Sequence, residues 1–192
     1  MGPDVAKATK SAAKIFSVIR RPSTIDPLSE EGTTPYSGAF NGTIEFKDVW
    51  FRYPTRLQQW VFKGLNLKIN QNDAIAIVGE SGQGKSTFIN LVMRFYDPEF
   101  GQVLIDGVDI KTVNVSHLRQ KLGLVMQEPI LFNYTLTENI LYGKLDASNE
   151  EVQNAAQVAN AREFIESKEL SSAFSDEPAA LKEQMASNEY KE

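Results

Sequence analysis

The nine residues "GESGQGKST" at positions 79–87 constrain this chain more than any other stretch. They match the pattern G-x-x-x-x-G-K-[ST] through Gly79, Gly84, Lys85 and Ser86. Glycines let a backbone curl until successive N–H groups point into one concavity, and a helix that starts there favours anions. The apolar run "AIAIV" before the pattern predicts a parallel strand over residues 74–78, covered on both faces. The apolar sequence after it predicts a buried helix over residues 86–96.

The chemistry of this loop indicates that it holds the phosphate chain of a nucleotide. Lys85 supplies a point charge for the outer phosphates. The Ser86 hydroxyl suits Mg²⁺, a hard ion that prefers oxygen ligands. Main-chain amides of the whole loop would wrap the phosphates, so the candidate binding residues are Gly79, Ser81, Gly82, Gln83, Gly84, Lys85, Ser86 and Thr87.

Several further segments predict β-structure. The stretch "GTIEFKDVWFRYP" alternates apolar residues and then changes parity, which indicates a bulge near Lys47 and Asp48. "GLNLKIN" alternates as a strand does, and "GLVMQ" at residues 123–127 predicts another strand. "QVLIDGVDI" predicts two short strands joined by Asp106 and Gly107. Because more strand follows Asp106, we interpret it as a turn residue and not as a metal-binding Asp at a strand end.

Helical signals lie on both sides of these segments. Apolar residues at three- and four-residue spacing predict a helix over residues 4–21, which Pro22 ends. The Pro-, Ser-, Thr- and Gly-rich stretch that follows, up to residue 43, is typical of a linker. Further along, Thr135 precedes Glu138 by three residues and Ser148 precedes Glu151 in the same way, so each pair predicts a capping box at the start of a helix.

Composition excludes several classes of protein. The chain has no cysteine, which excludes disulfides, thiolate metal sites and thiol nucleophiles. The net charge of −5 argues against a nucleic-acid partner. No apolar run approaches the ~20 residues of a membrane helix, and we see no signal peptide. Lys and Arg gather in residues 1–21, whereas Asp and Glu gather in residues 166–192, where we expect a charged polar tail or insertion.

Other phosphate-loop proteins fit less well. A GTPase needs a base-reading Asn-x-x-Asp after the loop, but "NQND" at residues 70–73 precedes it, and no Asp-x-x-Gly occurs. A soluble kinase needs a lid over its acceptor substrate, and we find no Arg-rich lid segment after the loop. A regulatory or interaction module that binds a nucleotide without transport stays open as an alternative.

Five stretches together resemble the nucleotide-binding domain of ABC exporters of the multidrug-resistance, P-glycoprotein-like type. They are "GTIEFKDVWFRYPTR", "VFKGLNLKI", "AIAIVGESGQGKST", "LVMRFYDPEFGQVLIDGVDI" and "VMQEPILFNYTLTENILYG", in this order. The resemblance covers residues 5–165. It implies an α/β fold with a P-loop NTPase core and an antiparallel β subdomain, incomplete on its C-terminal side. The expected domains are a juxtamembrane helix and linker over 1–43 and the N-terminal part of the nucleotide-binding domain over 44–165.

The resemblance also implies roles for residues outside the phosphate loop. Tyr53 matches the aromatic residue that stacks on adenine. Gln127 matches the glutamine that contacts Mg²⁺ and the attacking water, so Ser86 and Gln127 are the candidate metal ligands, with ATP and Mg²⁺ as the cofactors. Glu128 and the following loop would face the coupling helices of a transmembrane domain. His117, the single histidine, is interpreted as a helix-surface residue.

Members of this family also carry a signature motif, a second metal-binding Asp with an adjacent catalytic Glu, and a switch histidine, and none of these appears in the chain. We therefore assign no catalytic residue, and we expect Mg-ATP binding without appreciable hydrolysis by the isolated chain. The resemblance implies a head-to-tail dimer with a second nucleotide-binding domain, at the cytoplasmic face of a membrane, powering efflux.

Overall fold

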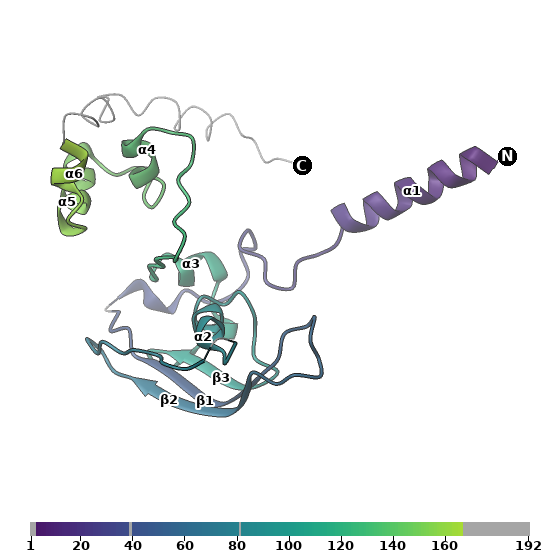
Figure 1. The fold of residues 1–192 in the computed structure, drawn as a ribbon, viewed down its shortest axis with the longest axis horizontal. Coiled ribbons are helices and arrows are strands. Elements are labelled where there is room, and N and C mark those ends of the chain that lie inside the picture. Colours follow the sequence, from purple (N-terminus) through teal and green to yellow (C-terminus); the bar gives the residue numbers. More distant parts are fainter. Residues whose placement is uncertain (1–2, 39, 81, 167–192) are drawn as a thin grey trace. The chain divides into compact units, whose positions relative to one another are not determined.

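The computed structural model describes residues 3–38, 40–80 and 82–166 of the 192-residue chain (Figure 1). By its internal contacts the chain forms two compact units, Met1–Leu124 and Val125–Glu192. Each unit is described by itself below. The predicted polar tail over residues 166–192 lies, apart from Glu166, outside the described residues.

The first unit begins with helix α1, Pro3–Ile19, which confirms the helix predicted at this end of the chain. The amide of Arg20 still donates to the carbonyl oxygen of Phe16, and Pro22 follows because it cannot continue the ladder. Phe16 and Val18 are exposed on α1. Among the helices that the structure describes, none combines the length and apolar character that crossing a bilayer requires.

An antiparallel sheet forms the centre of the first unit (Figure 1). Its strands run in the order β2-β1-β3-β4. Their bounds are Ile44–Phe51 for β1, Phe62–Ile69 for β2, Phe100–Ile105 for β3 and Val108–Asp109 for β4. The β3–β4 turn at Asp106 and Gly107 confirms the predicted hairpin. Two short 3-10 helices, Pro35–Ser37 and Ile110–Thr112, flank the sheet in sequence.

Strand β1 carries the predicted bulge. Its register against β2 shifts between Phe46 and Val49, and Asp48 has a left-handed backbone with φ of 46°. On the other side of the bulge lies Gly101 of β3, whose φ is +80°. A Cβ atom on Gly101 would lie 2.2 Å from the carbonyl oxygen of Asp48. The bulge therefore requires glycine at position 101, where the two backbones approach most closely.

The core fills the space between the sheet and two helices, α2 (Lys85–Val92) and α3 (Val115–Arg119). The Phe88 ring of α2 stacks on Phe46 of β1, with centroids 4.5 Å apart. Leu91 of α2 and Leu118 of α3 are fully buried in the same cluster. Figure 1 shows α2 lying over the sheet, so the phosphate loop is attached at its downstream end to the best-packed part of the unit.

The predicted strand over residues 74–78 is wrong for this structure. The segment is irregular, no described residue forms a β-ladder with it, and Val78 is 92% exposed. The strand predicted over residues 123–127 is likewise absent from the described structure, and Val125 is 95% exposed. An apolar run becomes a strand only where a neighbour supplies N–H and C=O groups. Across the described residues, the single parallel bridge outside named strands joins Thr33 to Val113.

Helix α2 is shorter than the predicted helix over residues 86–96, because it ends at Val92. Arg94 has a φ of 51°, which is left-handed and stops the helix. The helix is also less buried than predicted. Phe88 and Leu91 lie in the core, but Ile89 is exposed.

Within its described part, up to residue 166, the second unit contains three short helices, α4 (Leu136–Leu141), α5 (Asn149–Val158) and α6 (Arg162–Glu166). Both predicted capping boxes are present. Thr135 and Glu138 exchange hydrogen bonds at the start of α4, and Ser148 and Glu151 do so at the start of α5. Each of these helices buries at least one apolar residue; the four are Leu141, Val152, Ala156 and Ile165.

Candidate nucleotide-binding site

The backbone of the phosphate loop has the curvature that the glycines predict. Gly82 and Gly84 both have positive φ angles, of 85° and 90°. Gly84 also forms the N-cap of α2, so the loop leads directly into the unpaired N–H groups of a helix start. A Cβ atom on Gly84 would lie 2.6 Å from a methyl carbon of Val61. Val61, which packs against the core, therefore leaves room for no side chain at position 84.

Lys85 closes the loop in this structure. Its Nζ donates to the carbonyl oxygens of Gly79 and Glu80, each at 2.7 Å. The ammonium group thus lies within the curve of the loop, beside the start of α2, and both are groups that attract phosphate. Ser86, the next residue of α2, is exposed and carries a hydroxyl that a hard cation accepts as a ligand. This combination fits the phosphate chain of a nucleotide with its Mg²⁺.

A second contact across the loop could not be read from the sequence. Glu80 and Gln83 are joined by two hydrogen bonds. The Glu80 amide donates to Gln83 Oε1 and Gln83 Nε2 donates to Glu80 Oε2, both at 3.3 Å. The Gln83 side chain is therefore turned back onto the loop. Ser81, also a predicted binding residue, lies outside the described residues.

The structure joins Tyr53 to the helix that follows the loop. The Tyr53 hydroxyl lies 2.8 Å from Thr87 Oγ1, and Asn90 Nδ2 donates to it at 3.2 Å. Thr87 is buried, so this hydroxyl pair satisfies a polar group inside the unit. The rings of Phe51 and Tyr96 contact Tyr53 edge-on, at centroid distances of 5.0 and 5.2 Å. Tyr53 is thereby held at a fixed position relative to α2.

Asn90 and Tyr96 contact the candidate residue Tyr53, and the sequence reasoning did not select either of them. Each lies on or just after α2, and each contacts Tyr53 from far along the chain. Such contacts depend on how the end of β1 packs on α2, which no local pattern encodes. The sequence offered one indication of these contacts, namely a polar and an aromatic residue in or just after a helix that is otherwise apolar.

Gln127 belongs to the second unit, whereas Tyr53 and the phosphate loop belong together to the first. Residues 122–135 have no regular secondary structure, and Gln127 is exposed. The loop after it is fastened by Asn139 of α4, whose Oδ1 accepts from the Phe132 amide at 2.9 Å. Asn139 Nδ2 also donates to the carbonyl oxygen of Thr135 at 2.9 Å.

Asp106 is confirmed as a turn residue with a structural task. Its carboxylate accepts hydrogen bonds from three successive amides, those of Asn41, Gly42 and Thr43, at 2.8 to 3.2 Å. A carboxylate saturated in this way holds the chain that enters β1. It is not presented to a metal ion.

His117 is not the simple helix-surface residue that the sequence suggested. Its ring stacks on the buried Tyr36 ring at a centroid distance of 5.9 Å and an interplanar angle of 6°. Its Nε2 atom is buried without a hydrogen-bond partner. His117 therefore packs under the segment that leads into the sheet.

Comparison with known proteins identifies the family. Residues 62–185 match the family described as ABC transporter. The chain is 52% identical over 165 residues to ABC transporter B family member 2 of Dictyostelium discoideum, which covers 86% of this chain and 12% of that protein. It is 47% identical over 169 residues to multidrug resistance protein 4 of Entamoeba histolytica, which covers 85% of this chain and 12% of that protein.

A solved structure agrees. A bacterial Atm1-family ABC exporter with ATP bound superimposes with a TM-score of 0.69 and 34% identity, over 85% of this chain and 28% of that one. The chain belongs to the ABC transporter family and has the fold of its ATPase domain, as the resemblance predicted. Membership in this family implies ATP binding. The chain spans about an eighth of the length of the two relatives named above.

Proposed function

We propose that this chain binds Mg-ATP through the loop at residues 79–87 and acts as part of the nucleotide-binding domain of an ATP-driven exporter. The observation that carries the proposal is the loop itself. Lys85 lies within its curve, and Gly84 leads it into the start of α2 with no room for a side chain. The family match and the ATP-bound exporter among similar structures support the same ligand.

In this proposal each loop residue has a distinct task. Lys85 exchanges the carbonyl oxygens of Gly79 and Glu80 for the outer phosphates, because a dianion attracts the ammonium more strongly than two carbonyl dipoles do. The loop amides and the start of α2 hold the remaining phosphate oxygens. Ser86 and Gln127 supply oxygen ligands for Mg²⁺.

Tyr53 would present its ring to the adenine base. Its hydroxyl is already engaged by Thr87 and Asn90, which orients the ring before any nucleotide arrives. Thr87 then contributes to the site mainly by positioning Tyr53. A pre-oriented aromatic ring loses little conformational entropy on binding, and this favours affinity.

We further propose that the isolated chain binds without hydrolysing. Its sequence provides no carboxylate in the position of a general base, and Asp106 is committed to backbone amides. Hydrolysis and transport would require a second nucleotide-binding domain in a head-to-tail dimer and a transmembrane domain. The exposed loop around Gln127 and Glu128 would contact that membrane partner at the cytoplasmic face.

Isothermal titration calorimetry of the 192-residue chain with Mg-ATP tests the proposal. We expect a saturable heat that Lys85→Ala lowers by at least about tenfold in affinity, which corresponds to ~1.4 kcal/mol. Lys63→Ala, an exposed lysine on β2, is the matched control and should bind as the parent chain does. No heat from a chain whose circular dichroism shows it to be folded would contradict the proposal. Phosphate release above background by the isolated chain would contradict its non-hydrolytic part.

A further inference from the structure

The segment between α1 and the sheet is fastened to the first unit. The Thr33 amide donates to the carbonyl oxygen of Thr112, and the Asn114 amide donates to that of Thr33, both at 2.9 Å. Asn114 Nδ2 donates to the carbonyl oxygen of Ser29, also at 2.9 Å. At Gly32, a Cβ atom would lie 2.5 Å from the Asn114 backbone nitrogen. Residues 29–33 are therefore built to lie against residues 112–114.

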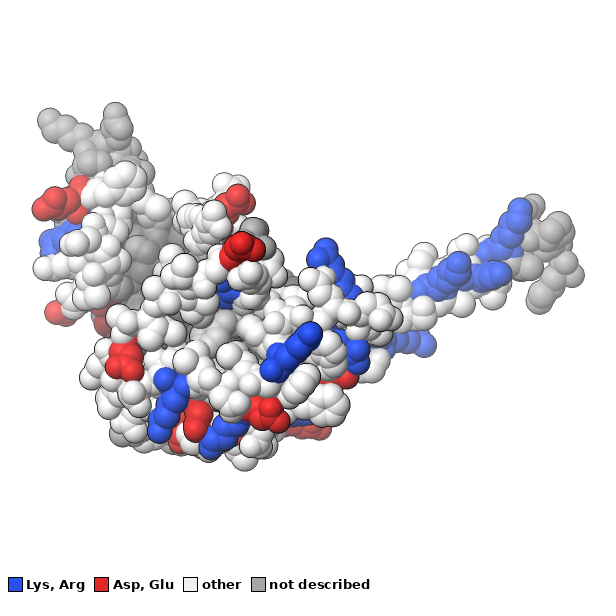
Figure 2. Space-filling model, turned by 60° about the horizontal axis from the view of Figure 1, so that its bottom comes forward, with Lys and Arg blue, Asp and Glu red and all other residues white. Residues whose placement is uncertain are grey.

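Just before this fastened part lies an exposed hydroxyl preceded by two arginines. Arg20, Arg21, Pro22 and Ser23 follow the end of α1 and are all exposed. The chain is irregular from residue 21 to residue 23, and Ser23 Oγ donates to the Ile25 carbonyl oxygen within its own turn. This is the one Arg-Arg pair in the sequence. Lys and Arg side chains also gather along α1 and the segment after it (Figure 2).

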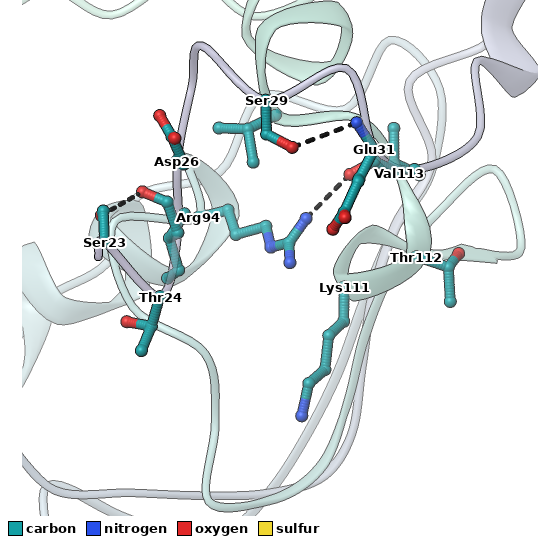
Figure 3. Close-up of a pocket in the computed structure, with 12 residues that line it drawn as sticks. Ser23, Thr24, Asp26, Ser29, Glu31, Arg94, Lys111, Thr112 and Val113 are labelled. Atoms are coloured by element: carbon teal, nitrogen blue, oxygen red, sulfur yellow. Dashed lines mark hydrogen bonds between the residues drawn. The ribbon is translucent and has the colours of Figure 1, made fainter.

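Ser23 lines a cavity of about 440 Å³ that contains basic side chains (Figure 3). Arg94 extends along the cavity from the turn after α2, and Lys111 lines it from the segment after β4 with its side chain pointing away from Arg94. Arg94 is buried, donating through Nη1 to the Val113 carbonyl oxygen at 2.8 Å and through Nε to Asp97 at 3.1 Å. Asp26 and Glu31 also line the cavity, so its charges are mixed before any modification.

The surroundings of Arg94 are electropositive. Arg119 donates to the main-chain carbonyl oxygens of Met93 and Arg94, so a second positive charge is held at the turn that carries Arg94. Burial lowers the pKa of Arg119, and the charge of Arg94 lowers it further. Arg94 forms an ion pair with Asp97, and two arginine charges at this turn favour an additional anion.

We propose that Ser23 is a phosphorylation site for an Arg-directed serine/threonine protein kinase, and that Lys111 and Arg94 hold the resulting phosphate in the cavity and so restrain residues 23–32. The proposal is independent of nucleotide binding at the phosphate loop.

The modification is an ordinary phosphoryl transfer. Ser23 Oγ forms a bond to the γ-phosphorus of ATP held by the kinase, while the bond from that phosphorus to the ADP oxygen breaks. The hydroxyl proton passes to the kinase's catalytic carboxylate. Kinases of this class read cationic side chains ahead of the acceptor, and Arg20 and Arg21 stand three and two residues before Ser23. Exposure and irregular backbone make the hydroxyl accessible to an active site.

Phosphorylation adds nearly two negative charges and three strong acceptor oxygens to the wall of the cavity. Lys111 is exposed and forms no salt bridge with any described residue, so its ammonium can turn toward the new anion. The Arg94 guanidinium presents its remaining nitrogen from a fixed position. The segment would then be held at Ser23 as well as at residues 29–33.

Phosphorylation in vitro tests the first half. The chain is incubated with the catalytic subunit of an Arg-directed kinase and Mg-ATP, with a kinase-free control, and the phosphosite is mapped by tandem mass spectrometry. We expect one phosphate, on Ser23, abolished by Ser23→Ala and kept by the matched control Thr24→Ala. Replacing Arg20 and Arg21 together by Ala should slow the reaction at least about tenfold. Phosphate on Thr24 alone, or no dependence on the arginines, would overturn the assignment.

Hydrogen–deuterium exchange tests the second half. In the phosphorylated chain, the amides of residues 24–32 should exchange at least about threefold more slowly than in the unmodified chain. Phosphorylated Lys111→Ala should lose this protection while retaining the fold, since Lys111 is exposed. Equal or faster exchange in the phosphorylated parent chain would show that the cavity does not hold the phosphate.

Discussion

Strand β1 and residues 74–78 are both rich in apolar side chains, yet they have opposite fates. β1 pairs with β2 on one side and β3 on the other, and its Phe46 and Val49 are buried. Residues 74–78 find no ladder among the described residues, and Val78 is almost wholly exposed. The difference teaches that an apolar pattern specifies a strand only together with its neighbours, since backbone N–H and C=O groups need partners as much as side chains need cover.

The same comparison explains how the phosphate loop is held. Its downstream end is α2, which the core anchors through Phe88 and Leu91. Its upstream end has no such anchor, and the two Lys85 hydrogen bonds to Gly79 and Glu80 tie it to α2. The lysine that we propose for phosphate binding thus also fixes the loop when it makes no contact with phosphate.

Replacing Val49 or Val78 by aspartate should have very different effects on stability. Val49→Asp places an unpaired carboxylate in the core and should destabilise the chain by more than ~4 kcal/mol. Val78→Asp puts the same group at an exposed position and should change the free energy of unfolding by less than about 0.5 kcal/mol. Urea denaturation followed by circular dichroism measures both. Comparable losses in the two variants would mean that residues 74–78 are packed.

A somewhat smaller effect is expected where β1 and β3 touch at the bulge. Gly101→Ala would push a methyl group into the Asp48 carbonyl oxygen at an unfavourable φ, and we expect a loss of about 3 kcal/mol. Gly107→Ala is the matched control, because its φ is also positive, at +79°, but no atom lies within 4 Å of the added carbon. It should cost only about 1 kcal/mol. If denaturant titrations gave the same loss of stability for both variants, the loss would come from the positive φ alone and not from the contact with Asp48.

Tyr36 should make the stability of the chain depend on pH in the alkaline range. Tyr36 is buried and donates to the Ile105 carbonyl oxygen at 3.2 Å. Burial, and then the charge of Asp106, raises its pKa from 10.0 to about 12. Because the folded-state pKa lies above the unfolded one, this contribution is complete below pH 10 and is lost as pH rises through about 12. The loss amounts to about 2–3 kcal/mol.

Tyr36→Phe isolates that contribution. The variant should be less stable by ~1 kcal/mol at neutral pH, through the lost hydrogen bond, and its stability should fall less steeply than that of the parent chain between pH 10 and 12. Tyr142→Phe, at a half-exposed position, is the control and should keep the parent's pH profile. Identical slopes for Tyr36→Phe and the parent would contradict the assignment.

Features written in a few neighbouring residues could be predicted from the sequence. The parity change at Lys47 and Asp48, the Asp106–Gly107 turn and both capping boxes all appear as predicted. Each depends on local conformational preference. The resemblance to ABC exporters, which rests on several such stretches in order, was confirmed by the family match.

Features that depend on distant partners could not be predicted in the same way. Whether residues 74–78 and 123–127 form strands depends on the chain segments that lie beside them, and the amino-acid sequence of each segment does not determine this. The contacts of Tyr53 with Thr87, Asn90 and Tyr96 arise from the packing of β1 on α2. The two hydrogen bonds between Glu80 and Gln83 depend on how the loop closes around Lys85.

The attachment of residues 29–33 has a mechanical consequence. Hydrogen bonds connect this stretch to residues 112–114. Arg94, in the turn that ends α2, donates a hydrogen bond to the Val113 carbonyl oxygen. The segment that precedes the sheet is therefore restrained and cannot move freely with respect to residues 112–114. A force applied to the backbone at α1 would therefore be transmitted through these hydrogen bonds to the C-terminal end of α2, the helix that carries Lys85.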